Sequence, residues 1–133
     1  MAKFSELTTK KSPNWCGGCG DFPILMSVKN AIAELGVEQE NVLLVSGIGC
    51  SSKLPYWVKT YAFKGLHGRP LPVATGAKLA NHELTVIVIA GDGDGYGEGT
   101  NHFIHTARRN INLTYVVHNN GVYGLTTGQT TPT

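Results

Sequence analysis

The sequence predicts an α/β fold, with a parallel sheet flanked by helices. Three short segments are almost continuously apolar, which is typical of strands that are buried on both faces; they are residues 42–45, 85–90 and 113–117. Helical patterns separate these segments, and this alternation favours parallel pairing. Most glycines outside the N-terminal region follow the apolar runs, at 47–49, 91–99 and 121–128. Because glycine suits a backbone with φ > 0 or one close to a ligand, we expect loops at these positions.

The N-terminal region is expected to divide into an arm and the start of the domain. Residues 1–22 show no periodic pattern and are rich in polar residues, glycine and cysteine, so we expect an irregular, extended arm. The α/β domain is expected over residues 23–133. Pro23 suits the first turn of a helix, the apolar spacing continues to Leu35, and Gly36 suits the C-terminal cap of that helix.

The middle of the chain shows fewer regular patterns. Residues 51–73 carry three prolines and no clear period, so we expect no regular element there. Short helices are expected at residues 74–81 and 100–109. In the second helix, the side chains expected to face inward are those of Phe103, Ile104 and Ala107.

Composition argues against several classes of function. The net charge of +2, from 11 basic and 9 acidic residues, is too small to indicate a nucleic-acid or anionic-membrane partner. The longest apolar run, Val86 to Ala90, is too short to span a bilayer, and the N-terminus lacks the apolar region of a signal peptide. The three cysteines therefore favour a reducing compartment, and we expect a cytoplasmic protein.

Glycines and polar residues stand where the three predicted strands end. In parallel sheets, ligands bind outside the carboxyl ends of the strands, which lie at one edge of the sheet. The segments concerned are residues 46–50, 91–94 and 118–121. The sequence therefore predicts a binding site along this edge.

A glycine-rich loop after the second predicted strand carries three acids, Asp92, Asp94 and Glu98. Backbone N–H groups before a helix attract anions such as phosphate. A phosphate beside these carboxylates would be repelled, however, because two like unit charges about 4 Å apart repel by about 1 kcal/mol in water and about 4 kcal/mol at an effective dielectric of 20. A divalent cation between the carboxylates and the phosphate attracts both and so replaces this repulsion. Mg²⁺ is usually bound by few carboxylates, together with phosphate oxygens and neutral oxygens. Asn119 and Asn120 supply such oxygens. The alternative is a glycine-rich surface turn with solvated acids.

Gly91-Asp92-Gly93, followed 28 residues after Asp92 by Asn120, resembles the thiamine diphosphate motif. Longer segments are similar to beta subunits of 2-oxoacid:ferredoxin oxidoreductases; they are residues 15–20, 46–52, 67–69, 74–76, 101–102, 107–110 and 123–126. The resemblance covers residues 15 to 133 and implies a thiamine-diphosphate-binding fold. Because the family continues past this point, the domain is expected to be incomplete at its C-terminus.

The resemblance also implies a metal site and a cofactor site. Asp92, Asn120 and the backbone carbonyl of Val122 would hold Mg²⁺, and His67 would lie near the thiazolium ring. The cofactor-binding set is Ile48, Gly49, Cys50, Ser51, His67, Gly93, Asp94, Gly124 and Leu125. Glu98 departs from the family, which usually has an apolar residue there. It adds a negative charge that nothing in the sequence offsets.

Cys16, Cys19 and Cys50 admit several interpretations. Cys16-x-x-Cys19 after Trp15 could be a thioredoxin-like motif, although no buried strand precedes it. With Cys50 and His67 the pair could bind zinc, and three unrelated thiols are a further alternative. The resemblance implies a [4Fe-4S] cluster on the three cysteines, with a fourth cysteine further along. Because none follows Cys50, we expect an N-terminal fragment or one piece of a split subunit.

The resemblance implies an oxidoreductase that converts a 2-oxoacid, such as pyruvate or 2-oxoglutarate, and coenzyme A to an acyl-CoA and CO₂. Electrons would pass through the cluster to ferredoxin. Lys53 would bind the substrate carboxylate, unless it is a solvated surface lysine. In this family a partner subunit supplies the glutamate that contacts the aminopyrimidine. Alpha subunits, with gamma or delta subunits in some complexes, are therefore the expected partners.

Two other functions stay open at this point. A non-redox thiamine diphosphate enzyme, of the decarboxylase or synthase type, has no need of the three cysteines, so an iron assay separates it from the first interpretation. A non-catalytic metal-cluster subunit would keep the fold only as a scaffold. Binding of thiamine diphosphate in the presence of Mg²⁺ separates that alternative.

Overall fold

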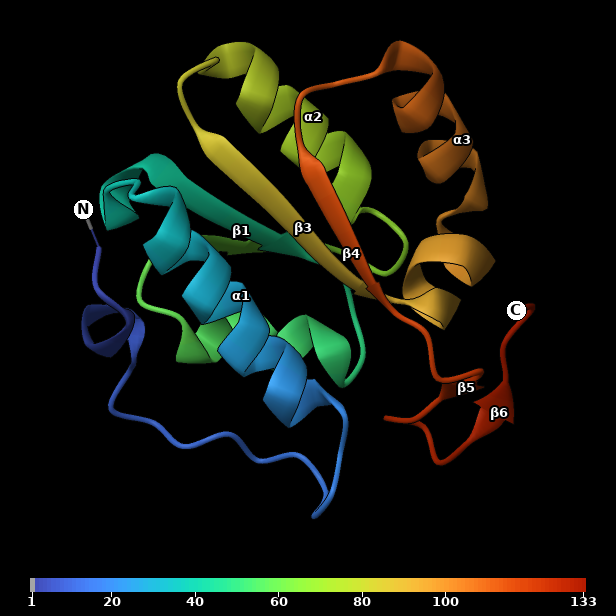
Figure 1. Cartoon of the computed structure of the whole chain (residues 1–133). Coiled ribbons are helices and arrows are strands. Elements are labelled where there is room, and N and C mark those ends of the chain that lie inside the picture. Colours follow the sequence, from blue (N-terminus) through green and yellow to red (C-terminus); the bar gives the residue numbers. More distant parts are fainter. Residues whose placement is uncertain (1) are drawn as a thin grey trace.

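A parallel sheet of four strands lies at the centre of the computed structural model, which describes residues 2–133 (Figure 1). The strands follow the order β2-β1-β3-β4. Their bounds are Val42–Ser46 for β1, Tyr61–Lys64 for β2, Thr85–Gly91 for β3 and Thr114–His118 for β4. The predicted α/β class is thereby confirmed, and so are the three predicted strands.

Helices cover both faces of the sheet (Figure 1). Helix α1 (Asp21–Leu35) packs on one face, and α2 (Pro70–Ala80) and α3 (Thr100–Arg109) lie on the other. Helix α1 begins at Asp21, so that Pro23 stands in its first turn, where a missing N–H costs nothing. It ends at Leu35 and is capped by Gly36, whose φ of 66° is left-handed, as the sequence predicts.

The expectation that residues 51–73 have no regular element is wrong. They contain a 3₁₀-helix (Ser51–Trp57), the strand β2 and the first turn of α2. Strand β2 escapes sequence-based prediction because it is an edge strand with all four residues exposed, so it has no buried apolar pattern. Helix α2 begins at Pro70 rather than Ala74 because Pro70 and Pro72 occupy its first turn, the one part of a helix that tolerates them.

Strand β3 divides the core into two layers. Ile87 and Ile89 pack with α1 and the N-terminal arm, whereas Val86 and Val88 pack on the side of α2. Each fully buried side chain of this kind stabilises the fold by about 1.5–3 kcal/mol. The loop that follows β3 is therefore anchored by the most buried strand of the sheet.

Helix α3 buries less of its surface than the sequence suggests. Phe103 faces inward as predicted, with ring centroids 5.0 Å from Tyr96 and 6.0 Å from Tyr115. Ile104 and Ala107 are exposed, so that part of the prediction is wrong. The helix lies beside α2 and β4 at the border of the sheet, and only a narrow stripe of it meets other elements (Figure 1).

The N-terminal arm, expected to be irregular over residues 1–22, contains a 3₁₀-helix at Phe4–Leu7 and passes into α1 at Asp21, and it packs into the same core as α1. Leu7 is fully buried there, and Trp15 makes edge-on ring contacts with Phe22 and Trp57, at centroid distances of 5.4 and 4.4 Å. The indole N–H of Trp15 donates a hydrogen bond to the carbonyl of Cys50 at 2.7 Å. The arm therefore fixes the position of the cysteines that follow Trp15.

Short elements complete the chain. They are the 3₁₀-helices Phe4–Leu7 and Gln39–Asn41, the π-helical segment Gly93–Glu98, and the antiparallel strands β5 (Val122–Tyr123) and β6 (Gln129–Thr130). Within residues 2–133, no helix combines the length and the apolar character that crossing a membrane requires.

Candidate functional site

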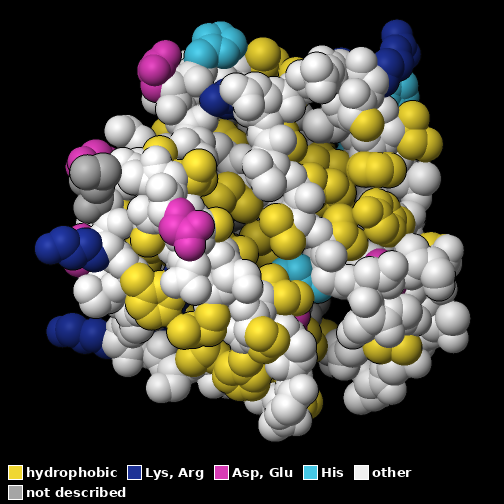
Figure 2. Space-filling view, in the orientation of Figure 1, with side chains coloured by type: hydrophobic (Ala, Val, Ile, Leu, Met, Phe, Trp, Pro, Cys, Tyr) yellow, Lys and Arg dark blue, Asp and Glu magenta, His cyan; other side chains and the backbone are white. Residues whose placement is uncertain are grey.

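The carboxyl ends of three strands meet at one edge of the sheet, as predicted. In the parallel register Ser46 of β1 pairs with Ile89 of β3, and Gly91 of β3 pairs with His118 of β4. A cavity of about 430 Å³ opens at this edge. The space-filling view shows a hollow between the body of the molecule and the C-terminal segment (Figure 2). The volume lies in the range of about 300–1,000 Å³ that is usual for cofactor and ligand sites.

Most residues that the sequence predicts for the site line this cavity: Cys16, Cys19, Ile48, Gly49, Cys50, Ser51, His67, Gly93, Asp94, Asn120, Val122, Gly124 and Leu125. Asp92 and Lys53 are not among the lining residues. Three further lining residues are those to which sequence reasoning gives no role of their own, namely Asp21, His118 and Tyr123; the last two appear there only within longer segments.

Asp92 lies beneath the lining and is fully buried. One carboxylate oxygen, Oδ2, accepts hydrogen bonds from the hydroxyls of Thr131 and Thr133, and the other accepts one from the N–H of Asn120 at 3.3 Å. Burial by itself raises the pKa of Asp92, but these hydrogen bonds together outweigh burial and hold the pKa below its usual value. Asp92 is therefore a carboxylate at neutral pH.

The donor set around Asp92 suits Mg²⁺ in its chemistry. A carboxylate, the amide oxygen of Asn120 and the backbone carbonyls of the same loop are hard oxygen ligands. The side-chain oxygen of Asn120 here accepts a hydrogen bond from the N–H of Val122 at 3.1 Å, and carbonyl oxygens keep a second lone pair. For Asp92 to bind a metal through Oδ2, Thr131 and Thr133 must release that oxygen.

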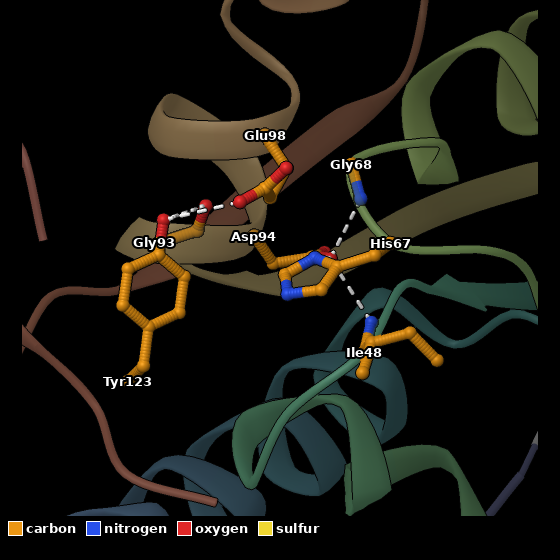
Figure 3. Close-up of polar contacts among 7 residues, drawn as sticks. All are labelled: Ile48, His67, Gly68, Gly93, Asp94, Glu98 and Tyr123. Atoms are coloured by element: carbon orange, nitrogen blue, oxygen red, sulfur yellow. Dashed lines mark hydrogen bonds and ion pairs between the residues drawn. The ribbon is translucent and has the colours of Figure 1, made fainter. Parts of the chain in front are cut away.

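Asp94 joins three loops of the site, as Figure 3 shows. Its Oδ1 accepts hydrogen bonds from the N–H of Ile48 at 3.0 Å and the N–H of Gly68 at 2.8 Å, and it lies 2.7 Å from Nδ1 of His67. The resemblance implies that Asp94 contacts the cofactor. In the structure, its carboxylate contacts loops that border the cavity.

Glycine is required at two positions around Asp94. A Cβ atom at Gly47 would lie 1.9 Å from Oδ2 of Asp94, so any larger residue displaces the carboxylate. Gly68 has a φ of +68°, and a Cβ there would lie 2.6 Å from the backbone carbon of Glu98. Two glycines of the candidate motifs therefore make room for one buried acid and its partners.

Glu98, whose negative charge has no evident partner in the sequence, is not among the residues that line the cavity. Its side chain is exposed, and Oε1 accepts a hydrogen bond of 3.5 Å from the hydroxyl of Tyr123 (Figure 3). Burial raises the pKa of Tyr123, and the negative charge of Glu98 raises it further. The extra acid is thus paired with a tyrosine hydroxyl and faces solvent.

A buried contact between two side chains connects the site to helix α1. Nδ1 of His118, at the end of β4, lies 2.5 Å from Oδ1 of Asp21, at the start of α1, and both side chains are at most 10% exposed. Sequence reasoning missed this pair because Asp21 resembles an ordinary helix-capping acid. The signal that could have found it is His118, a lone ionisable residue at the end of an apolar strand.

Replacing His118 by alanine is expected to loosen the start of α1. Removing the imidazole leaves Oδ1 of Asp21 buried without this partner, and an unsatisfied buried polar group costs up to about 3 kcal/mol. Hydrogen–deuterium exchange of the backbone around Asp21 should therefore become about a hundredfold faster. The control is His82→Ala, since His82 is exposed and precedes β3, at the opposite end of the sheet. Equal exchange in the two variants would contradict the assigned role.

The three cysteines border the same cavity and are free thiols. The N–H of Cys19 donates to the carbonyl of Cys16 at 3.1 Å, which closes the turn between them. Burial raises the pKa of Cys19, and the charge of Asp21 adds to this effect. Among residues 2–133, no three histidine, cysteine or acidic residues converge in the manner of a metal site. The cysteines therefore share one space without already forming a metal cage.

Lys53 is half-buried on the 3₁₀-helix Ser51–Trp57, which follows the loop after β1. Its backbone N–H donates to the carbonyl of Cys50 at 3.2 Å, while the cavity is lined by other residues. The structure thus brings Lys53 beside the loop that carries Cys50 and does not place it in the cavity wall.

Comparison with known proteins identifies relatives of the chain. Residues 47–133 match the family described as "Thiamine pyrophosphate enzyme, C-terminal TPP binding domain". The chain is 49% identical over 131 residues to 2-oxoglutarate oxidoreductase subunit KorB of Mycobacterium tuberculosis, covering 98% of this chain and 35% of that protein. It is 56% identical over 128 residues to subunit beta of 2-oxoacid:ferredoxin oxidoreductase 2 of Aeropyrum pernix, covering 96% and 41%.

A solved structure is similar over almost the whole chain. It is the 2-oxoglutarate:ferredoxin oxidoreductase from Magnetococcus marinus, with 2-oxoglutarate, coenzyme A and succinyl-CoA bound. The TM-score is 0.96 at 48% identity, and the match covers 99% of this chain and 45% of that one. The chain thus spans less than half the length of these relatives.

Proposed function

Because the chain belongs to the thiamine pyrophosphate enzyme family and its relatives are beta subunits of 2-oxoacid:ferredoxin oxidoreductases, we propose that it is the thiamine-diphosphate-binding part of such a beta subunit. One observation carries the proposal. The two halves of the Gly91-Asp92-Gly93…Asn120 motif meet at the cavity, where the N–H of Asn120 reaches Asp92 at 3.3 Å. Glycine loops from β1 and β4 border the same space.

In this proposal Asp92, Asn120 and the carbonyl of Val122 hold Mg²⁺, and the loops at 48–51 and 124–125 border the cofactor. Thiamine diphosphate, when bound, supplies the electron sink that decarboxylation of a 2-oxoacid requires. The residues of this chain provide the rest: oxygen ligands for the metal, a cavity of about 430 Å³ and fixed loops. Asp94 fixes two of these loops through the N–H groups of Ile48 and Gly68.

Cys16, Cys19 and Cys50 are proposed to hold a [4Fe-4S] cluster together with a fourth ligand from outside these residues. Their common cavity supports this, since it also contains the loops proposed for the cofactor. Electrons from the substrate would then have a short path to the cluster and onward to ferredoxin. Iron in place of zinc is a testable part of the proposal.

The complete enzyme is proposed to convert a 2-oxoacid and coenzyme A to an acyl-CoA and CO₂ in the cytoplasm. Its other subunits would be the alpha subunits, with gamma or delta subunits in some complexes, and one of them would supply the glutamate that contacts the aminopyrimidine. Because the Magnetococcus marinus enzyme is described with 2-oxoglutarate and succinyl-CoA, 2-oxoglutarate is the first substrate to test.

A substrate panel tests the proposed function. The complete complex is supplied with coenzyme A, ferredoxin and, in turn, 2-oxoglutarate, pyruvate, a branched 2-oxoacid and an aryl 2-oxoacid. At least one acid is expected to yield its acyl-CoA together with reduced ferredoxin. Aldehyde formation without ferredoxin reduction would indicate the non-redox thiamine enzyme. Absence of thiamine diphosphate binding would indicate the scaffold subunit.

Replacing Lys53 by methionine is expected to raise KM for the 2-oxoacid more than it weakens cofactor affinity. A hydrogen bond to a charged group contributes roughly 1.5–3 kcal/mol, which corresponds to about a ten- to hundredfold change. Steady-state kinetics of the complex test this, with Lys59→Met as control, because Lys59 is exposed nearby in sequence. A change of less than about twofold would show that Lys53 is an ordinary surface lysine.

A further inference from the structure

Thr131, the residue after β6, is hydrogen-bonded to two separate loops of the proposed metal site. Its hydroxyl donates a hydrogen bond to Oδ2 of Asp92, in the loop after β3. Its backbone N–H donates to the carbonyl of Gly121 at 3.1 Å, in the loop after β4. Figure 1 shows β5 and β6 beyond the carboxyl end of β4. One residue thus connects the loop of Asp92 with the loop that carries Asn120 and Val122.

The two carboxylate oxygens of Asp92 are engaged to different degrees. Each oxygen of a carboxylate offers about two lone pairs. Oδ2 accepts hydrogen bonds from the hydroxyls of Thr131 and Thr133, the second at 2.6 Å, so both of its lone pairs are in use. Oδ1 accepts the N–H of Asn120 at the longer distance of 3.3 Å. Oδ1 is therefore the less engaged oxygen, and it lies on the side of Asn120, the second proposed ligand.

Thr131, rather than Thr133, is the hydroxyl that holds Oδ2. Thr131 is 4% exposed, and its hydroxyl has the carboxylate and the hydroxyl of Thr133 as acceptors, of which the charged group accepts more strongly. Thr133 is exposed, and its hydroxyl also lies 3.4 Å from the side-chain oxygen of Asn119. A hydroxyl carries a single hydrogen, so Thr133 divides it among more acceptors and water.

We propose that Thr131 is a positioning residue for the metal ligand Asp92: its hydroxyl holds Oδ2 and so leaves Oδ1 as the oxygen for Mg²⁺. This inference rests on the proposed function. Carboxylates that bind metals are in turn hydrogen-bonded, and loss of the outer partner typically weakens metal affinity about 10–100-fold. Through its backbone bond to Gly121, Thr131 also ties Asp92 to the loop that carries the other two ligands.

The opposite role would be competition, in which the hydroxyl blocks Asp92 against the metal. The two roles differ in sign, because loss of a competing hydroxyl strengthens metal binding and loss of a positioning hydroxyl weakens it. Burial favours positioning. A metal that displaced Thr131 from Oδ2 would leave a buried hydroxyl without its charged acceptor, whereas a metal on Oδ1 leaves that hydrogen bond intact.

The test compares Thr131→Val, Thr131→Ser and Thr130→Val in the complete complex. Valine keeps the shape of threonine without the hydroxyl, serine keeps the hydroxyl, and Thr130 is the exposed neighbour in β6. Calorimetry measures thiamine diphosphate binding over a series of Mg²⁺ concentrations, and EPR of Mn²⁺ measures occupancy of the metal site directly. In Thr131→Val the metal concentration for half-maximal binding should rise about 10–100-fold. In the other two variants it should stay within about threefold of wild type.

The dependence on metal separates positioning from a general effect on the fold. At saturating Mg²⁺, the affinity of Thr131→Val for thiamine diphosphate should return to that of wild type, because the metal site is weakened and not removed. A loss that is equal at every Mg²⁺ concentration would show that Thr131 only supports β5 and β6, and would overturn the proposal. So would unchanged or tighter metal binding in Thr131→Val. A wild-type complex that does not bind thiamine diphosphate with Mg²⁺ would contradict the proposed function instead.

Discussion

Replacing Asp92 by alanine is expected to abolish Mg²⁺-dependent binding of thiamine diphosphate while the complex still assembles. Asp92 is the fully buried acid of the motif, and its low pKa keeps it charged. Without this carboxylate, the phosphate groups lose the metal that offsets their charge against the acids of the loop. Calorimetric titration of the complex with thiamine diphosphate, with and without Mg²⁺, measures the effect.

Glu98→Ala is the matched control for Asp92. Glu98 belongs to the same loop but is exposed, is not among the residues that line the cavity, and pairs with the hydroxyl of Tyr123. Its removal should leave the affinity within about twofold of wild type. Asp92→Asn, which keeps the side-chain size and can still accept hydrogen bonds from Thr131 and Thr133, should lose affinity as Asp92→Ala does. Unchanged affinity in both Asp92 variants would refute the metal assignment.

Replacing Cys50 by serine is expected to remove the iron–sulfur cluster and, with it, electron transfer to ferredoxin. A [4Fe-4S] cluster needs thiolate ligands, usually four, and this chain offers three at one cavity. The backbone of Cys50 is held by Trp15, so the substitution should leave the loop in place. Iron and sulfide should fall to background, the EPR signal of the reduced cluster should disappear, and thiamine diphosphate should still bind.

Counting metals in the same samples tests whether the three cysteines bind an iron–sulfur cluster or another metal. Iron and zinc are measured together in the wild-type complex and in Cys50→Ser, prepared without oxygen. Zinc in the wild-type protein, at a level that falls in the variant, would support a zinc site instead of the cluster. Full iron and an unchanged EPR signal in Cys50→Ser would show that the cluster ligands lie elsewhere.

The main lines of the fold could be predicted from the sequence because its central strands are apolar on both faces. Val86 and Ile87 pack into opposite layers of the core, and because both faces of the strand are buried, its residues are apolar without interruption. Strand β2 could not be found in this way, since its exposed residues carry no burial pattern. Proline in a first helical turn is easily interpreted as irregular structure. For this reason the sequence predicts the start of α2 at Ala74, although the helix begins at Pro70.

The membership of the site could be predicted better than its contacts. Motifs identify loops, and the parallel sheet brings the loops to one edge, so Ile48, His67 and Asn120 do line one cavity. The resemblance to beta subunits is confirmed by the relatives in the same way. Contacts between side chains far apart in sequence leave no such trace. The bond of Asp94 to His67 and the pair of His118 with Asp21 appear only once the loops are placed.

The most direct test of the central claim is the product stoichiometry of one defined reaction. The complete complex is given limiting 2-oxoacid with excess coenzyme A and oxidised ferredoxin, and acyl-CoA, CO₂ and reduced ferredoxin are counted together. Oxidative decarboxylation releases two electrons for each CO₂, so acyl-CoA should equal CO₂ and two ferredoxins of the one-electron type should be reduced for each. CO₂ accompanied by an equal amount of aldehyde, with ferredoxin left oxidised, would contradict the account.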